Sequence, residues 1–161
     1  GVINSILRRL GLISTDIGTV TLIDEAVTVR QGDRTWPAVK VDVGNPHAVV
    51  FVEGGVLEGL ELHHAPVWEP ATAYPEGVNV EFIHVESPGR LRMRVHERGV
   101  GETMSCGTGV VAAAAAYCAS TGFEGPVVVN VPGGELTVDL TGDDARLTGP
   151  AVIVGRGEFW I

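Results

Sequence analysis

The densest group of chemically active side chains lies between residues 97 and 109, in the run Glu-Arg-Gly-Val-Gly-Glu-Thr-Met-Ser-Cys-Gly-Thr-Gly. This run leads into an uncharged stretch with helical character, so Cys106 is expected at the start of a helix. The first amides of a helix have no acceptor inside it, and together with the helix dipole they favour a thiolate. We therefore predict that the pKa of Cys106 lies below that of a free cysteine.

The same turn offers a site for an anion. Gly107 and Thr108 have small side chains, so a carboxylate can come close to their backbone amides. A thiolate beside a bound carboxylate is suited to removing the proton next to that carboxyl group. A single cysteine is often only a small core residue, but here the nearby charges of Glu97, Arg98 and Glu102 favour a functional site.

Glu97 ends a run in which apolar and polar residues alternate. Its parity places it on the same face as Leu91, Met93 and Val95, which points to the interior. A buried carboxylate without a partner is costly. Two explanations stay open: Glu97 has a cationic partner, such as Arg98 or a ligand amine, or a bulge turns it toward solvent.

Two shorter groups could add polar contacts. In Gly44-Asn45-Pro46-His47, the proline holds Asn45 extended and so aims its amide, and His47 offers a side chain of the type that can exchange a proton or donate a hydrogen bond. Asn79 begins a strand-like run, where a polar residue can face a pocket or simply end a loop. Each group alone is equally typical of an ordinary turn or strand start.

The sequence shows no pattern for a metal or for a lysine-bound cofactor. His63 and His64 are adjacent, so on a strand they point to opposite sides, and no Cys or carboxylate follows at zinc-ligand spacing. Cys118 and Cys106 lie roughly 18 Å apart if one helix carries both, which is too far for a shared site. Lys40 is the only lysine available for a pyridoxal phosphate Schiff base.

Most of the surrounding elements are predicted to be short strands. They are expected at 19–23, 26–30, 39–43, 48–52, 78–85, 90–97, 127–131 and 135–140, with two more near Val152 and Phe159. Residues 54–62 predict a weak helix, and 65–77 a loop. Residues 110–119 carry no charge and predict a helix enclosed by protein. The sum predicts an α+β fold: a mostly antiparallel curved sheet, barrel-like, wrapped around one central apolar helix.

The chain divides into two predicted parts. In residues 1–13, apolar side chains at helical spacing over 2–10, followed by Gly11, predict a short amphipathic helix of unclear role. Residues 14–161 predict a single lobe, because the total of 161 residues suits one domain.

Composition excludes several classes of function. The formal net charge is -9, whereas binding to a phosphate backbone needs clustered Lys and Arg. The sequence has no run of about 20 apolar residues that would predict a membrane span, and its first residues lack the pattern of a secretory signal. Two cysteines are too few for a disulfide scaffold and indicate a reduced, cytoplasmic setting.

At these residues the chain resembles the C-terminal half of the diaminopimelate epimerases. The run 97–109 resembles that family's second catalytic-cysteine motif, and residues 44–47 and Asn79 stand at matching places in the same order. The likeness extends from about Val39 to the C-terminus. Related cofactor-free racemases and phenazine-pathway isomerases share the fold, but the run that begins at Glu97 favours the epimerases.

The resemblance implies inversion of one α-carbon of 2,6-diaminopimelate, between the LL and meso forms, in lysine and cell-wall synthesis and without a cofactor. Two cysteines on opposite faces of the carbon would exchange its proton, and Cys106 matches the one from the C-terminal half. Gly107 and Thr108 would bind the reacting carboxylate through their amides. The other matching residues would hold the distal end of the substrate (Asn45, Asn79 and Arg98), or contact the reacting amino group or tune the thiol (Glu97 and His47).

The family's other catalytic cysteine lies in a Cys-Gly-Asn-Gly segment of an N-terminal half, and this sequence contains no such segment. A two-base inversion needs a base on each face of the carbon. We therefore expect the 161 residues alone to bind substrate poorly and not to epimerise it. The missing N-terminal lobe, or another chain, is the expected partner, and a homo-oligomer is expected as well.

Two other functions compete with this one. A thiol hydrolase or transferase would use Cys106 as nucleophile and His47 or His96 as base. A lone lobe could instead act without catalysis as a binding or assembly module, in which the apolar face of residues 2–10 packs against a partner or a second copy.

Overall fold

The structure is a computed structural model that describes residues 11–152. Helices are few: α2 (Gly54–Glu58), α3 (Gly107–Thr121) and a short 3-10 turn, η1 (Ala71–Ala73). The strands are β1 (Leu12–Gly18), β2 (Thr21–Gln31), β3 (Arg34–Asp42), β4 (Pro46–Phe51), β5 (Val67–Glu69), β6 (Asn79–Ser87), β7 (Arg90–Glu97), β8 (Gly101–Thr103), β9 (Val127–Val131), β10 (Gly134–Asp139) and β11 (Ala145–Pro150).

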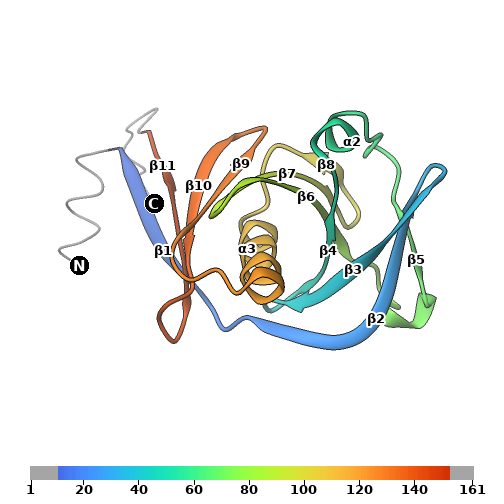
Figure 1. Ribbon diagram of the computed structural model, residues 1–161, viewed down its shortest axis with the longest axis horizontal. Helices are drawn as coiled ribbons and strands as arrows, with labels where there is room; N and C mark the ends of the chain where they lie inside the picture. The colour runs from blue at the N-terminus through green and yellow to red at the C-terminus, as the bar shows by residue number, and fades with distance from the viewer. Residues whose placement is uncertain (1–10, 153–161) are drawn as a thin grey trace, which may run out of the picture.

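The eleven strands within residues 11–152 belong to one sheet in the order β1-β11-β10-β9-β7-β6-β4-β3-β2-β5, with β8 paired to β7. Two pairs are parallel, β4 with β6 and β7 with β9, and the other described pairs are antiparallel. The sheet curves around α3, which lies inside the curve (Figure 1). The predicted α+β architecture is therefore confirmed.

Helix α3 can lie inside the sheet because its surface is small and apolar all round. Five consecutive alanines, 112–116, are buried and let the strands approach the helix axis closely. Val110, Val111 and Tyr117 extend this core toward the two ends of the helix. The helix ends at Gly122, whose φ of 70° is left-handed and lets its amide donate to the carbonyl of Cys118 at 2.8 Å.

A second core lies on the opposite face of the central strands. Val80 and Phe82 of β6 pack there with residues of α2 and of the segment that follows it. Strand β6 is consequently covered on both faces, and by alternation its residues 81 and 83 face α3. Ile83 does belong to the core around α3. This parity is what aims Glu81 at the helix.

The boundaries of several elements differ from those predicted. The predicted runs 19–23 and 26–30 are one strand, β2, with a register shift between Ile23 and Val27. The predicted loop 65–77 contains β5 and η1, and β1 and β8 were not expected. These short strands have little pattern of their own and exist because they pair with a neighbour.

The strand predicted near Val152 corresponds to β11, the last described strand, which ends at Pro150. β11 pairs with β1 on one side and β10 on the other, which places it earlier in the chain than the apolar pattern indicated. The helix predicted at 2–10 and the strand near Phe159 lie outside the described residues, and β1 begins at Leu12. Within residues 11–152, no helix has the length and apolar character needed to cross a membrane.

Candidate active site at the start of helix α3

Cys106 is the residue immediately before α3, as the sequence predicted. Its φ of -129° and ψ of 111° are extended, and its carbonyl accepts the first helical hydrogen bond, from Val110, at 2.9 Å. The residue is 9% exposed. The thiol is therefore both at a helix start and largely withdrawn from water.

This burial reverses the predicted direction of the thiol pKa. Loss of solvent raises the pKa of Cys106 above the usual cysteine value, and the carboxylates of Glu81 and Glu97 raise it further. The Thr108 hydroxyl, 3.6 Å from the sulfur, and the Gly109 amide act in the opposite direction. The prediction of a lowered pKa was wrong because it counted the helix start and not the desolvation of the thiolate.

Glu81 is a component of the site that the sequence did not single out. Its side chain is completely buried, and Oε1 lies 2.7 Å from Nδ1 of His47. Its second oxygen, Oε2, has no hydrogen-bond partner among the described residues. Burial raises the pKa of Glu81, against the opposing effect of its bond to His47. A buried carboxylate this poorly satisfied indicates a functional reason for its presence.

His47 connects Glu81 to Asn45. The ring is completely buried, and its Nε2 lies 3.0 Å from Oδ1 of Asn45. The Tyr74 hydroxyl donates to the His47 carbonyl at 3.2 Å, which fixes the backbone at the start of β4. Because β4 and β6 run parallel, His47 stands opposite Asn79 in the sheet register. Two short motifs far apart in sequence are thus adjacent in the structure.

Gly109 explains how a glutamate fits beside the helix. A Cβ at this position would stand 2.6 Å from Glu81 Oε1 and 3.3 Å from Cys106 Sγ. A contact this short is not tolerated, so any side chain at position 109 would displace the Glu81 carboxylate from its present place. Because Gly109 has no side chain, Glu81 and Cys106 can both lie close to this position.

Asn79 and Arg98 lie together in the structure. The Arg98 backbone amide donates to Asn79 Oδ1 at 2.9 Å, and its guanidinium donates to the Glu76 carbonyl at 3.4 Å. Arg98 also lines a pocket of about 320 Å³ with Pro46, Gly77 and other residues of this edge. The contact with Asn79 holds the backbone of Arg98, a cationic residue that lines that pocket.

Glu97 is not paired with Arg98, so of the cationic partners considered for it the ligand amine stays a prediction. It is only partly buried, and its carboxylate accepts a hydrogen bond from the Thr103 hydroxyl. No Lys, Arg or His of residues 11–152 forms an ion pair with it. A hydroxyl partner leaves the remaining acceptor capacity of Glu97 for a ligand amine.

Glu102 belongs to the same sequence run and serves a different purpose. Both of its oxygens accept from the Arg94 guanidinium, at 2.7 and 2.9 Å, and Arg94 also donates to the Leu57 carbonyl. The Arg94 charge and hydrogen bonds lower the pKa of Glu102. This carboxylate ties the β7–β8 hairpin to the α2 region and does not belong to the site.

His96, one of the two bases considered for a thiol hydrolase, is also engaged elsewhere. It is buried, and its Nδ1 lies 2.8 Å from the Leu62 carbonyl, on the face of β7 away from Cys106. His47 reaches Glu81 and Asn45, and no bond between His47 and the thiol is present. The structure therefore does not supply the direct Cys–His pair that a thiol nucleophile uses.

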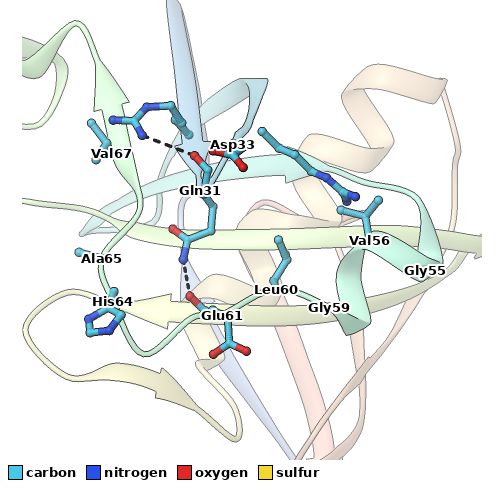
Figure 2. Close-up of a pocket in the computed structure, with 13 residues that line it drawn as sticks. Gln31, Asp33, Gly55, Val56, Gly59, Leu60, Glu61, His64, Ala65 and Val67 are labelled. Carbon is cyan, nitrogen blue, oxygen red and sulfur yellow. Dashed lines mark hydrogen bonds between the residues drawn. The ribbon is translucent and has the colours of Figure 1, made fainter.

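A larger hollow, of about 600 Å³, lies away from this site, between the tip of the β2–β3 hairpin and α2 (Figure 2). Figure 2 shows Gln31 pointing to the backbone of Glu61, with Asp33 and His64 at the margins. None of the residues predicted for the site lines it. Among the described residues, no group of His, Cys, Asp and Glu is arranged to hold a metal ion.

Comparison with known proteins gives one consistent family. A family model described as diaminopimelate epimerase matches residues 39–158. The chain is 45% identical to the diaminopimelate epimerase of Streptomyces coelicolor, over 95% of this chain and 55% of that protein. It is 40% identical to the enzyme of the same name from Rhodococcus opacus, over 98% of this chain and 55% of the relative. The chain thus spans about half the length of the curated relatives it matches.

Solved structures show the same fold at low sequence identity. A predicted epimerase from Pseudomonas aeruginosa matches with a TM-score of 0.60 and 17% identity, over 93% of this chain and 59% of the other. A phenazine biosynthesis protein of the PhzF family from Bacillus anthracis matches with a TM-score of 0.54 and 15% identity, over 93% of this chain and 61% of the other.

Proposed function

The chain belongs to the diaminopimelate epimerase family, and we propose that it forms one of two lobes that together invert an α-carbon of 2,6-diaminopimelate. The observation that carries this proposal is the position of Cys106, a buried thiol directly before the first amides of α3. The second base would come from an N-terminal half, because the relatives are about twice as long as this chain.

The first turn of α3 would bind the reacting carboxylate. The Gly107 and Thr108 amides belong to the turn whose N–H groups have no intrahelical acceptor, so they can donate to an anion. As the α-proton leaves, negative charge spreads from the carbon onto the carboxylate. Donors already aimed at those oxygens stabilise this charge without having to reorganise.

Cys106 would exchange the proton on one face of the carbon. In one direction its thiolate takes the α-proton and becomes the thiol, while a thiol on the other face gives a proton to the carbon. In the reverse direction Cys106 is the donor. In the free lobe, burial and the neighbouring carboxylates favour the protonated thiol of Cys106, which is the form that donates a proton. No redox step or leaving group is involved, and the protons balance.

The remaining residues would hold the substrate in this position. We assign the reacting amino group to Glu97, whose carboxylate is half-buried with a hydroxyl partner only, and to the neighbourhood of His47. Asn45, Asn79 and Arg98 would bind the distal end, beside the pocket that Arg98 lines. We place the reaction in the cytoplasm, since a catalytic thiol has to stay reduced.

Exchange of solvent deuterium tests the proposal. The chain is combined with the N-terminal half of the Streptomyces coelicolor relative, a mixture that we call the two-part assembly, and incubated with LL-diaminopimelate in D₂O. We expect deuterium at the α-carbon together with meso product, and neither from the chain alone. A covalent acyl adduct on Cys106 with an electrophilic substrate, and no deuterium at the carbon, would instead support a thiol hydrolase.

A further inference from the structure

The proposed reaction gives the buried carboxylate of Glu81 no role. This carboxylate lies near two residues that have one: Oε1 is 2.7 Å from the His47 ring, and the position of a Gly109 Cβ is 2.6 Å from Oε1 and 3.3 Å from the Cys106 sulfur. Oε2 has no partner among the described residues. A completely buried carboxylate with one unpartnered oxygen is costly to keep, so its retention calls for a functional explanation.

We propose that Glu81 is a positioning residue of the site, which fixes the His47 ring toward Asn45 and places a negative charge beside Cys106. The role of Glu81 in catalysis rests on the proposed function. Its contacts with His47 and near Cys106 rest on the geometry of the chain alone. Gly109 belongs to the same arrangement, because a Cβ at this position would displace the Glu81 carboxylate.

The hydrogen-bond inventory of His47 explains why the carboxylate matters. Nδ1 faces Glu81 Oε1 and Nε2 faces Asn45 Oδ1, so both ring nitrogens meet an oxygen acceptor. A proton shared between Nδ1 and Glu81 Oε1 satisfies the first contact, and a proton on Nε2 that is donated to Asn45 Oδ1 satisfies the second. Without Glu81 the completely buried ring has no partner for Nδ1 and no reason to keep its present orientation.

The charge of Glu81 acts on the thiol as well. It contributes to the raised pKa of Cys106, together with burial and Glu97. A thiol held in its protonated form is ready to donate to the substrate carbon and is protected from unwanted alkylation or oxidation before substrate arrives. Glu81 would thus couple the orientation of His47 to the protonation state of Cys106.

The test uses the 161-residue chain alone and two substitutions. Glu81→Gln keeps an acceptor for Nδ1 and removes the charge, and Glu81→Met fills a similar volume and removes both. Glu135→Gln is the matched control, because Glu135 is an exposed carboxylate paired with Arg90. Circular dichroism and thermal unfolding establish that each variant is folded.

The first readout is the pH profile of alkylation by iodoacetamide, followed peptide by peptide so that Cys118 serves as an internal reference. In both Glu81 variants we expect the Cys106 profile to move to lower pH and its rate just below the midpoint to rise about threefold. The Cys118 profile and the Glu135→Gln variant should not change. An unchanged Cys106 profile in the folded variants would overturn the proposal.

The second readout is the ¹⁵N and ¹H NMR signature of the His47 ring. The unchanged chain should show a downfield ring N–H proton from the bond to Glu81, which Glu81→Gln weakens and Glu81→Met removes. A signature identical in all the variants would contradict the positioning role. Neither readout needs the second lobe or a substrate, so failure here and failure of the deuterium exchange are separate results.

Discussion

The two ends of helix α3 each carry a cysteine, and their surroundings differ in kind. Cys106, before the first turn, lies beside two carboxylates and a threonine hydroxyl. Cys118, in the last turn, has a pKa that burial alone raises. Near that end, the Tyr117 hydroxyl accepts the Gly89 amide at 2.9 Å and its ring packs on Phe123, so the buried polar atom is satisfied.

This contrast shows how a functional end can be distinguished from a structural end of one helix. Both ends bury their cysteine at least in part, so burial does not separate them. What separates them is a poorly satisfied charged group, Glu81, retained at one end only. A buried charge of this kind lowers the stability of the fold. Its presence therefore indicates that the Cys106 end of α3 has a function.

The largest effect is expected from exchanging the two cysteines for serine in turn. Cys106→Ser removes one of two bases, so the two-part assembly should lose deuterium exchange at the α-carbon by about 100-fold or more. Cys118→Ser should change it by less than about twofold, because that thiol contacts no reacting group. Equal losses in the two variants would mean that the two ends do not differ in function.

Gly109→Ala and Gly122→Ala sharpen the comparison, because they add the same methyl group near each end. At Gly109 the new Cβ meets Glu81, a clash that costs about 1–3 kcal/mol, and it should also shift the alkylation profile of Cys106. At Gly122 the left-handed backbone costs an alanine about 1 kcal/mol, with no change at Cys106. Urea unfolding and peptide-resolved alkylation measure both effects, and a shifted Cys106 profile in Gly122→Ala would break the contrast.

Two buried or half-buried carboxylates should respond to pH with opposite signs. The pKa of Glu81 is raised by burial, so its contribution to stability is present at low pH and is lost as the pH rises. The pKa of Glu102 is lowered by Arg94, so its contribution is present at neutral pH and is lost as the pH falls through its pKa in the folded chain.

Substitution by glutamine therefore separates these two carboxylates. At pH 7, Glu81→Gln should raise the free energy of unfolding, and Glu102→Gln should lower it by about 1 kcal/mol. Both differences should shrink in acid, and urea unfolding at a series of pH values measures them. If Glu102→Gln has no effect at pH 7, the bidentate contact with Arg94 does not hold the β7–β8 hairpin as we infer.

Much of the fold could be predicted from the sequence because local pattern and tertiary environment agree. The uncharged run 110–119 predicted the enclosed helix, and the alternation in 90–97 predicted β7 with its observed bounds. The position of Cys106 before the helix followed from the same pattern. Short strands such as β5 and β8 could not be found in this way, since pairing partners, and not their own residues, define them.

The charged part of the site was harder to predict for a physical reason. The alternation in residues 79–83 places Glu81 on the face of the strand that Val80 and Phe82 do not occupy. By itself this pattern indicates that Glu81 faces solvent. In the structure both faces of β6 are covered, so that side chain is buried at the helix. The same burial raised the thiol pKa that the helix start was expected to lower. The alternation of polar and apolar residues along a strand does not show whether both of its faces are covered by protein.

The raised pKa also changes what alkylation of the free chain should show. At pH 7, Cys106 should react with iodoacetamide more slowly than free cysteine, because less of it is thiolate. Peptide-level mass spectrometry against a free-cysteine standard measures the two rates. A faster reaction at Cys106 would mean that the helix start outweighs desolvation.

Substrate protection of the two thiols tests the central claim most directly. The two-part assembly is alkylated with and without LL-diaminopimelate, and the rates at Cys106 and Cys118 are measured in the same digest. We predict that the rate at Cys106 falls saturably with substrate concentration while the rate at Cys118 stays constant. Equal rates at Cys106 with and without substrate would contradict the assignment of this end of α3 as the active site.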